Sequence, residues 1–306
     1  MNGQSGGLTL CGVELEGPVL NGSGTFDAIA ARRTFGDALL EDFPFHAYVS
    51  KTITAAPRAG NPPPRLWESA SGLVNSIGLP NRGLEGFLAH DLPELVHLPI
   101  PLVVSVMGFT RDELAGLAGA VGASDGVSLI ELNVSCPNVE TGLVMGADPE
   151  ETARAVAHAR RSTQTPLIVK LTPTAPDPAA VAVAAEGAGA DAVSLVNTLR
   201  GMAIDPATGE PWLGAGSGGL SGTAIRVVAL EQVAAVTATV EIPVIGMSGI
   251  ETGRHAADFL RSGATCVAVG TESFRDPRAG ERIAAELEHD QGARTASASV
   301  GHGSRL

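Results

Sequence analysis

The chain has 306 residues, of which 44% are hydrophobic and 17% charged, so the composition favours a large buried core over disorder. Its net charge of −13 argues against a broad nucleic-acid-binding surface, which needs clustered Lys and Arg. No apolar run is as long as a membrane span, and the N-terminus lacks the pattern of a signal peptide. Three scattered cysteines do not form a disulfide framework, so we expect a cytoplasmic protein. From the charge and the lack of long apolar runs we expect neither nucleic-acid nor membrane partners.

Short β-rich segments alternate with longer segments rich in Ala, Leu and Glu. A hairpin is expected before them, at 7–17, where it could plug the N-terminal face if the strands form a barrel. We expect strands at 18–21, 46–51, 102–106, 128–133, 167–171, 191–196, 242–246 and 265–269. Helices are expected at 149–163, 177–188, 223–238 and 252–262. This alternation predicts an α/β fold, a (β/α)8 TIM barrel with an N-terminal hairpin. The alternative is an open doubly wound sheet, which usually has a glycine-rich turn after its first strand.

Three long connections follow predicted strands, at 52–82, 134–148 and 197–222. In such a barrel these loops lie at the C-terminal face, and long loops inside a domain are usually functional. We expect one barrel domain over 1–285. The remaining 286–306 contain little apolar content and predict a flexible C-terminal tail.

Polar residues gather at the ends of six predicted strands, where a barrel has its active site. They are Asn21 to Ser23, Lys51, Ser105, Asn133, Lys170 and Asn197. One lysine alone would be read as a side chain extending from the rim into water. Two lysines on one rim, Lys51 and Lys170, favour an anionic ligand.

Glycine turns follow the last two predicted strands, at 246–249 and 270–271. Paired turns in this position favour a phosphate site, because backbone N–H groups there can approach the anion closely. The amides of Asn75, Asn133, Asn138 and Asn197 suit a planar ligand with imide groups, although each alone is typical of a turn.

Cys136 follows the fourth strand and lies among amides and hydroxyls, which makes it a candidate proton acceptor. Cys11 and Cys266 are interpreted as inert core residues. No histidine lies at a predicted strand end, and no pair has metal-ligand spacing, so we expect no metal site.

Several segments resemble class 1 dihydroorotate dehydrogenases, over about residues 7 to 278. The most specific are Glu131-Leu-Asn133-Val-Ser-Cys136-Pro-Asn138 and Gly218-Gly-Leu-Ser-Gly222. The others are Asn21-Gly-Ser23-Gly24, Gly60-Asn-Pro-Pro-Pro-Arg65, Asn75-Ser-Ile-Gly78-Leu-Pro-Asn81, Val196-Asn197-Thr198 and the two glycine turns. The stretch from Gly60 to Gly83 is most similar to the catalytic subunit of the NAD-linked subclass 1B.

The resemblance implies one FMN per chain and oxidation of (S)-dihydroorotate to orotate in pyrimidine (UMP) synthesis. Cys136 would remove the C5 proton while hydride leaves C6 for flavin N5, under a lid formed by the loop around 137–147. Substrate would contact Lys51, Asn75, Ser76, Ile77, Gly78, Leu79, Asn133, Asn197 and Thr198. FMN would contact Ser23, Gly24, Lys51, Thr52, Ser105, Asn133, Lys170, Val196, Gly222, Ser248, Gly249, Gly270 and Thr271. Ser105 and Ser248 depart from the family pattern, which has Asn and Gly there.

The same resemblance implies a homodimer, or a heterotetramer with an electron-transfer subunit that carries FAD and a 2Fe–2S cluster, because this chain has no cysteine cluster of its own. Three alternatives stay open: a fumarate-linked class 1A enzyme, a related FMN barrel acting on another pyrimidine, and a barrel kept as a binding or scaffold subunit.

Overall fold

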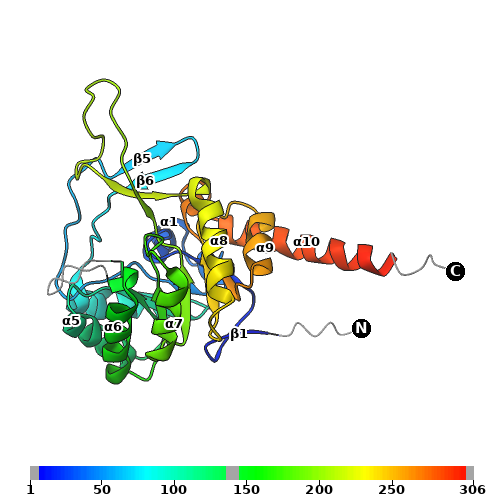
Figure 1. The fold of residues 1–306 in the computed structure, drawn as a ribbon, viewed down its shortest axis with the longest axis horizontal. Coiled ribbons are helices and arrows are strands. Elements are labelled where there is room, and N and C mark those ends of the chain that lie inside the picture. The colour runs from blue at the N-terminus through cyan, green and yellow to red at the C-terminus, as the bar shows by residue number, and fades with distance from the viewer. Residues whose placement is uncertain (1–6, 136–144, 301–306) are drawn as a thin grey trace.

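Eight parallel strands form a barrel in the computed structural model, which describes residues 7–135 and 145–300 (Figure 1). They are β3 (Val19–Asn21), β4 (Tyr48–Val49), β7 (Leu102–Val106), β8 (Val127–Asn133), β9 (Leu167–Lys170), β10 (Ala192–Leu195), β13 (Val244–Met247) and β14 (Cys266–Val269). Their order is β3-β14-β13-β10-β9-β8-β7-β4, and a parallel bridge between Leu20 and Ala47 nearly closes the ring. The predicted (β/α)8 barrel and all eight predicted strands are confirmed, with ends that differ by one to a few residues.

The barrel strands are buried on both faces, which explains why they are apolar without alternation. On β7, for example, Val103 belongs to the interior of the barrel, whereas Val104 packs in the layer between barrel and helices. The predicted hairpin consists of β1 (Leu8–Leu10) and β2 (Val13–Leu15). Its Leu10 and Leu15 belong to the same cluster as the interior residues, so the hairpin plugs the barrel as expected.

Helices follow one another around the outside of the barrel (Figure 1). They are α1 (Ala28–Phe35), α2 (Ala38–Glu41), α3 (Gly83–Gly86), α4 (Leu92–Leu95), α5 (Arg111–Gly122), α6 (Pro149–Ser162), α7 (Pro178–Gly187), α8 (Arg226–Thr237), α9 (Gly253–Arg261) and α10 (Ala279–Val300). Short single turns are η1 (Phe87–Asp91), η2 (Met145–Ala147), η3 (Thr223–Ile225) and η4 (Thr271–Phe274). The four predicted helices correspond to α6, α7, η3 with α8, and α9.

Side-chain caps explain where several of these helices begin. Thr110, Asp148, Asp177 and Thr252 each accept a hydrogen bond from the backbone N–H three residues later, at the starts of α5, α6, α7 and α9. Proline at the first position of α6 and α7 adds a fixed φ where no backbone donor is needed. Each cap thus satisfies a backbone N–H group that the first turn of its helix leaves without an intrahelical partner.

Two of the predicted long loops pair with each other to form an antiparallel sheet, here called the roof sheet. Its strands are β5 (Leu66–Ser69), β6 (Gly72–Asn75), β11 (Leu199–Gly201) and β12 (Gly218–Ser221), in the order β11-β12-β6-β5. The sequence predicted none of these strands. Figure 1 shows β5 and β6 lying beyond the barrel, and the segment between β11 and β12 projecting further still.

The last helix, α10, extends away from the barrel (Figure 1). It continues to Val300, so a helix occupies part of the segment 286–306 that was predicted as a tail. The flexibility of that tail stays a prediction. Among the described residues, no helix combines the length and the apolar character needed to span a membrane.

Candidate active site

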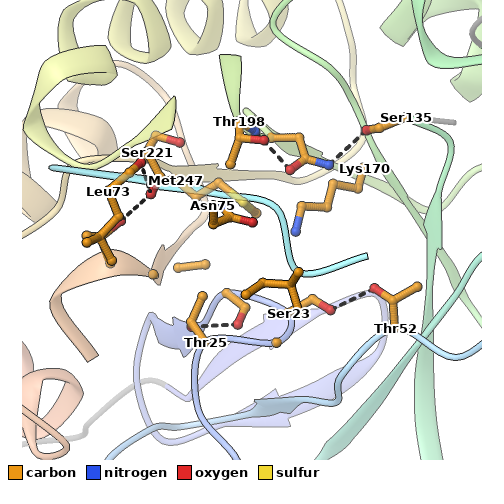
Figure 2. A pocket seen from close by; sticks show the side chains of 18 of the residues that line it. Ser23, Thr25, Thr52, Leu73, Asn75, Ser135, Lys170, Thr198, Ser221 and Met247 are labelled. Atoms are coloured by element: carbon orange, nitrogen blue, oxygen red, sulfur yellow. Dashed lines mark hydrogen bonds between the residues drawn. The ribbon is translucent and has the colours of Figure 1, made fainter. Parts of the chain in front are cut away.

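A cavity of about 320 Å³ opens at the C-terminal ends of the barrel strands, beneath the roof sheet (Figure 2). Asn133 and Lys170 end β8 and β9, and they line the cavity together with residues that follow β3, β4, β10, β13 and β14. Leu66, Leu73, Asn75 and Ser221 of the roof sheet also line it. Parallel strands that all point the same way bring these distant segments to one mouth.

Most of the predicted site residues meet in this cavity. Those that line it are Ser23, Gly24, Lys51, Thr52, Asn75, Ile77, Leu79, Asn133, Lys170, Val196, Asn197, Thr198, Gly222, Ser248, Gly249, Gly270 and Thr271. Ser76, Gly78 and Ser105 are not in its wall, and Ser76 instead accepts a hydrogen bond from Asn61. Cys136, Asn138 and most of the predicted lid around 137–147 lie outside the described residues.

Lys170 is the buried cation of the cavity. Its side chain points into the cavity (Figure 2), and its Nζ lies 3.8 Å from Oε1 of Glu131. Both side chains are less than a tenth exposed, so this ion pair has little screening by water. Lys51, by contrast, is exposed to solvent and reaches the cavity from the end of β4.

Hydroxyl groups connect Glu131 to the other side of the mouth. Ser105 Oγ donates to Glu131 Oε1 over 3.0 Å and lies 2.9 Å from Thr52 Oγ1. Thr52 Oγ1 is in turn 3.1 Å from Oγ of Ser23, which donates to the carbonyl of Ser50. Ser105 therefore stays in the site as a buried link behind the wall, where the family pattern led us to expect an asparagine.

Amide side chains line the cavity below the roof sheet. Asn75 Nδ2 donates to the carbonyl of Gly219, and its Oδ1 accepts no hydrogen bond from the described residues. Asn197 Nδ2 donates to Ser135 Oγ over 2.9 Å, and its Oδ1 accepts from the N–H of Thr198. The Asn75 oxygen is thus left available to a donor on a ligand, while the Asn197 amide is held in one orientation.

The glycine turns meet at another part of the wall. Ser248 has φ of 100°, a conformation that favours glycine, and its Oγ donates to the carbonyl of Val196. This hydrogen bond explains how serine is accommodated where glycine is usual. Gly24 and Gly270 face open space, because no atom lies within 3.4 Å of a Cβ built at either position. At Gly24 and Gly270 the backbone can therefore approach a phosphate group closely.

Several wall residues escaped the sequence analysis. Ser135 and Ser221 stand inside motifs that it quoted, so their position next to assigned residues was an available signal. Glu131, which lies behind the wall and does not line the cavity, also offered a signal, because it is a carboxylate within a mostly apolar strand. Gly22 and Met247 also stand inside quoted segments. The rest carry no chemical signal in the sequence; they are Thr25, Leu66, Leu73, Met107, Ala268 and Phe274.

The two described cysteines are remote from this chemistry. Burial, with the charge of nearby Asp191, raises the pKa of Cys11 to about 12. Burial also raises the pKa of Cys266 to about 12, and Cys266 lies in the barrel interior. Both thiols therefore stay protonated near neutral pH, in agreement with their interpretation as inert core residues.

Comparisons with known proteins agree along nearly the whole chain. A family model described as dihydroorotate dehydrogenase matches residues 7–290. A protein of Desulforudis audaxviator is 43% identical over 301 residues, which cover 96% of each chain. A protein of Pelobacter propionicus is 44% identical, covering 92% of this chain and 91% of the relative, and one of Listeria monocytogenes is 41% identical, covering 90% of each. All three are named dihydroorotate dehydrogenase B (NAD(+)), catalytic subunit.

Proposed function

Because the chain belongs to the dihydroorotate dehydrogenase family, we propose that it oxidises (S)-dihydroorotate to orotate in pyrimidine synthesis, with FMN held in the barrel mouth. The observation that carries this proposal is the cavity itself, which combines a buried lysine, oriented amides and the open glycines Gly24 and Gly270. These are the groups needed to hold, respectively, an electron-rich ring, a planar imide and a phosphate.

The residues present fit FMN. Gly24 and Gly270 leave a cradle that a side chain would fill, and turns of this kind suit the phosphate. Lys170 would lie against the flavin pyrimidine ring, where its charge stabilises the reduced form. Bound FMN would supply the acceptor for hydride from C6 of dihydroorotate. The other FMN contacts that we propose are those in the wall at Ser23, Lys51, Thr52, Asn133, Val196, Gly222, Ser248, Gly249 and Thr271, with Ser105 acting from behind.

Substrate would be held by the amides and by Lys51. The fixed amide of Asn197 and the available Oδ1 of Asn75 match the carbonyl and N–H groups of a pyrimidine ring. Thr198, Asn133 and the segment 76–79 complete the proposed substrate contacts. An ammonium group at Lys51 offers a partner for the substrate carboxylate.

We propose Cys136 as the base that removes the C5 proton, because of the sequence motif in which it lies and because of the family to which the chain belongs. It lies outside the described residues, but the preceding Ser135 lines the cavity and accepts a hydrogen bond from Asn197. A thiol that is partly ionised near neutral pH can take a proton from carbon made acidic by a neighbouring carbonyl. The chain's own contribution is thus a base, a fixed substrate and a buried positive charge.

We further propose NAD as the final electron acceptor, reached through a partner subunit that carries FAD and a 2Fe–2S cluster. The support is the name of the relatives, which specifies NAD(+) and a catalytic subunit. A homodimer of this chain, alone or in a heterotetramer with that partner, and a cytoplasmic location belong to the same proposal. So does the interpretation of residues 1–285 as one FMN-binding domain.

The purified protein tests these proposals directly. We expect it to bind FMN in a one-to-one ratio and its visible flavin absorbance to bleach under anaerobic dihydroorotate. Dihydrouracil is the matched control, because it tests the alternative of an FMN barrel that acts on another pyrimidine. Faster bleaching by dihydrouracil than by dihydroorotate would favour that alternative. Turnover with fumarate or NAD as the electron acceptor, measured with and without the partner subunit, distinguishes a fumarate-linked class 1A enzyme from an NAD-linked subclass 1B enzyme. Protein that cannot be loaded with FMN would rule the proposal out.

A further inference from the structure

Glu131 is a charged residue buried behind the cavity wall, and both of its carboxylate oxygens have partners. Oε1 accepts from Ser105 Oγ and faces Lys170 Nζ, and Oε2 accepts from Ser194 Oγ over 3.3 Å. The residue is 3% exposed and does not line the cavity. It contacts the site only through its neighbours.

The structure gives this carboxylate two links to the wall. One is the ion pair with Lys170, whose Nζ points into the cavity (Figure 2). The other is the hydroxyl chain through Ser105 and Thr52 to Ser23. A buried charge pair is held in place because either partner alone would be costly to keep in a dry site. The carboxylate therefore fixes the ammonium group and offsets part of its field at the cavity.

We propose that Glu131 is a positioning residue that acts through Lys170 and sets how much positive charge the cavity presents to reduced FMN. This inference rests on the proposed FMN site. Reduction places negative charge on the flavin pyrimidine ring, so an ammonium group that has lost its carboxylate partner stabilises the reduced form more than the oxidised form.

Glu131→Gln is the primary test, because it removes the charge and keeps the shape, with an amide oxygen that accepts from one hydroxyl and an amide N–H that donates to the other. The midpoint potential of bound FMN is measured by anaerobic titration against a reference dye, together with the dissociation constant of oxidised FMN. We expect the ratio of affinities for reduced over oxidised FMN to rise by about tenfold, which equals about 30 mV towards positive potential for a two-electron couple. Glu151→Gln is the matched control, because Glu151 is also buried and ion-paired but lies on α6 and does not line the cavity, and it should leave the potential unchanged.

Two further variants isolate the route through Lys170. In a Lys170→Gln background, Glu131→Gln should shift the potential by less than half as much as in the wild type. Glu131→Asp keeps the charge but withdraws it from Nζ, so a smaller positive shift is expected, and this variant decides the matter if Glu131→Gln does not fold. The inference is overturned if Glu131→Gln has the same FMN midpoint potential as Glu151→Gln. It is also overturned if Glu131→Gln shifts the potential as much in the Lys170→Gln background as in the wild type. Failure of the proposed function would appear instead in the wild type, as absent FMN or absent bleaching by dihydroorotate.

Discussion

The side chain of Asn75 donates a 3.1 Å hydrogen bond to the carbonyl oxygen of Gly219, across 144 residues of sequence. The two residues are also paired in register between β6 and β12. One amide thus joins the two halves of the roof sheet and, through its other atom, faces the cavity. The same side chain therefore makes a contact within the roof sheet and the substrate contact that we propose.

Asn75→Ala is expected to raise the KM for dihydroorotate by about tenfold or more, equivalent to at least ~1.4 kcal/mol of binding energy. The reason is the loss of the one Asn75 acceptor that the described residues leave without a donor. Steady-state kinetics measure the change in KM, and the midpoint of thermal unfolding reports whether the substitution destabilises the protein. A lowered unfolding midpoint with an unchanged KM would assign Asn75 to structure alone.

Gly72→Ala should damage the cavity from its roof. A Cβ at Gly72 would lie 1.9 Å from the carbonyl oxygen of Ser221, and its φ of 153° disfavours other residues. We expect a loss of about 1–3 kcal/mol in the free energy of unfolding and weaker FMN binding, measured by denaturation and by flavin release. Gly116→Ala on α5 is the control, because a Cβ there meets no atom within 4 Å and alanine favours a helix.

The three cysteines should differ in reactivity. With pKa values raised to about 12, Cys11 and Cys266 are protonated at about pH 8 and should resist alkylation in the folded protein. Cys136 should be modified first and be protected by orotate. Peptide mass mapping after timed alkylation checks this order, and rapid labelling of Cys266 before Cys136 would contradict it.

Cys136→Ser should lower the rate of flavin reduction by about 10²–10⁴-fold near neutral pH, because a serine hydroxyl is a much weaker acid than a thiol. Stopped-flow reduction by dihydroorotate measures the rate across a pH series. FMN binding should stay unchanged, which separates loss of the base from loss of the site. A wild-type rate in this variant would remove Cys136 from the proposed mechanism.

Acid should destabilise the protein partly through His46. Burial lowers the pKa of His46, opposed by the negative charges of Glu16 and Glu288, and its Nδ1 accepts a hydrogen bond from the N–H of Val19. The unfolded state then binds the proton more readily, so the stabilising contribution is present above the ordinary pKa of about 6.5 and is lost as the pH falls through the folded value. His46→Asn keeps an acceptor for Val19 and should show a smaller fall in unfolding free energy between about pH 7 and about pH 5. An equal fall in both proteins would exclude this cause.

The barrel could be predicted because strands buried on both faces, such as Cys266–Val269, appear in the sequence as an unbroken apolar run. Because active sites of such barrels lie at the C-terminal ends of the strands, the predicted strand ends also identified most of the residues that line the cavity. The roof sheet could not be predicted, because Leu199–Gly201 and Gly218–Ser221 are short, rich in glycine and only half-buried. Their strand character comes from partners far along the chain.

Pairings between side chains were equally hidden. The contact of Glu131 with Lys170 depends on the register of β8 against β9, which places Asn133 beside Lys170 and Glu131 two residues earlier. Sequence alone gives each strand but no register between them. The accommodation of Ser248 by the carbonyl of Val196 likewise depends on neighbouring barrel strands.

The pairing of β6 with β12 also bears on the order in which the chain can assemble. These strands are separated by the segment that contains β7 to β10, so their hydrogen bonds close a very long loop and carry its entropic cost. That cost is small once the intervening strands have already brought the ends together. We therefore expect the ligand pocket to form late in folding, and because its wall extends to Phe274, a nascent chain that has not emerged beyond that residue lacks part of it.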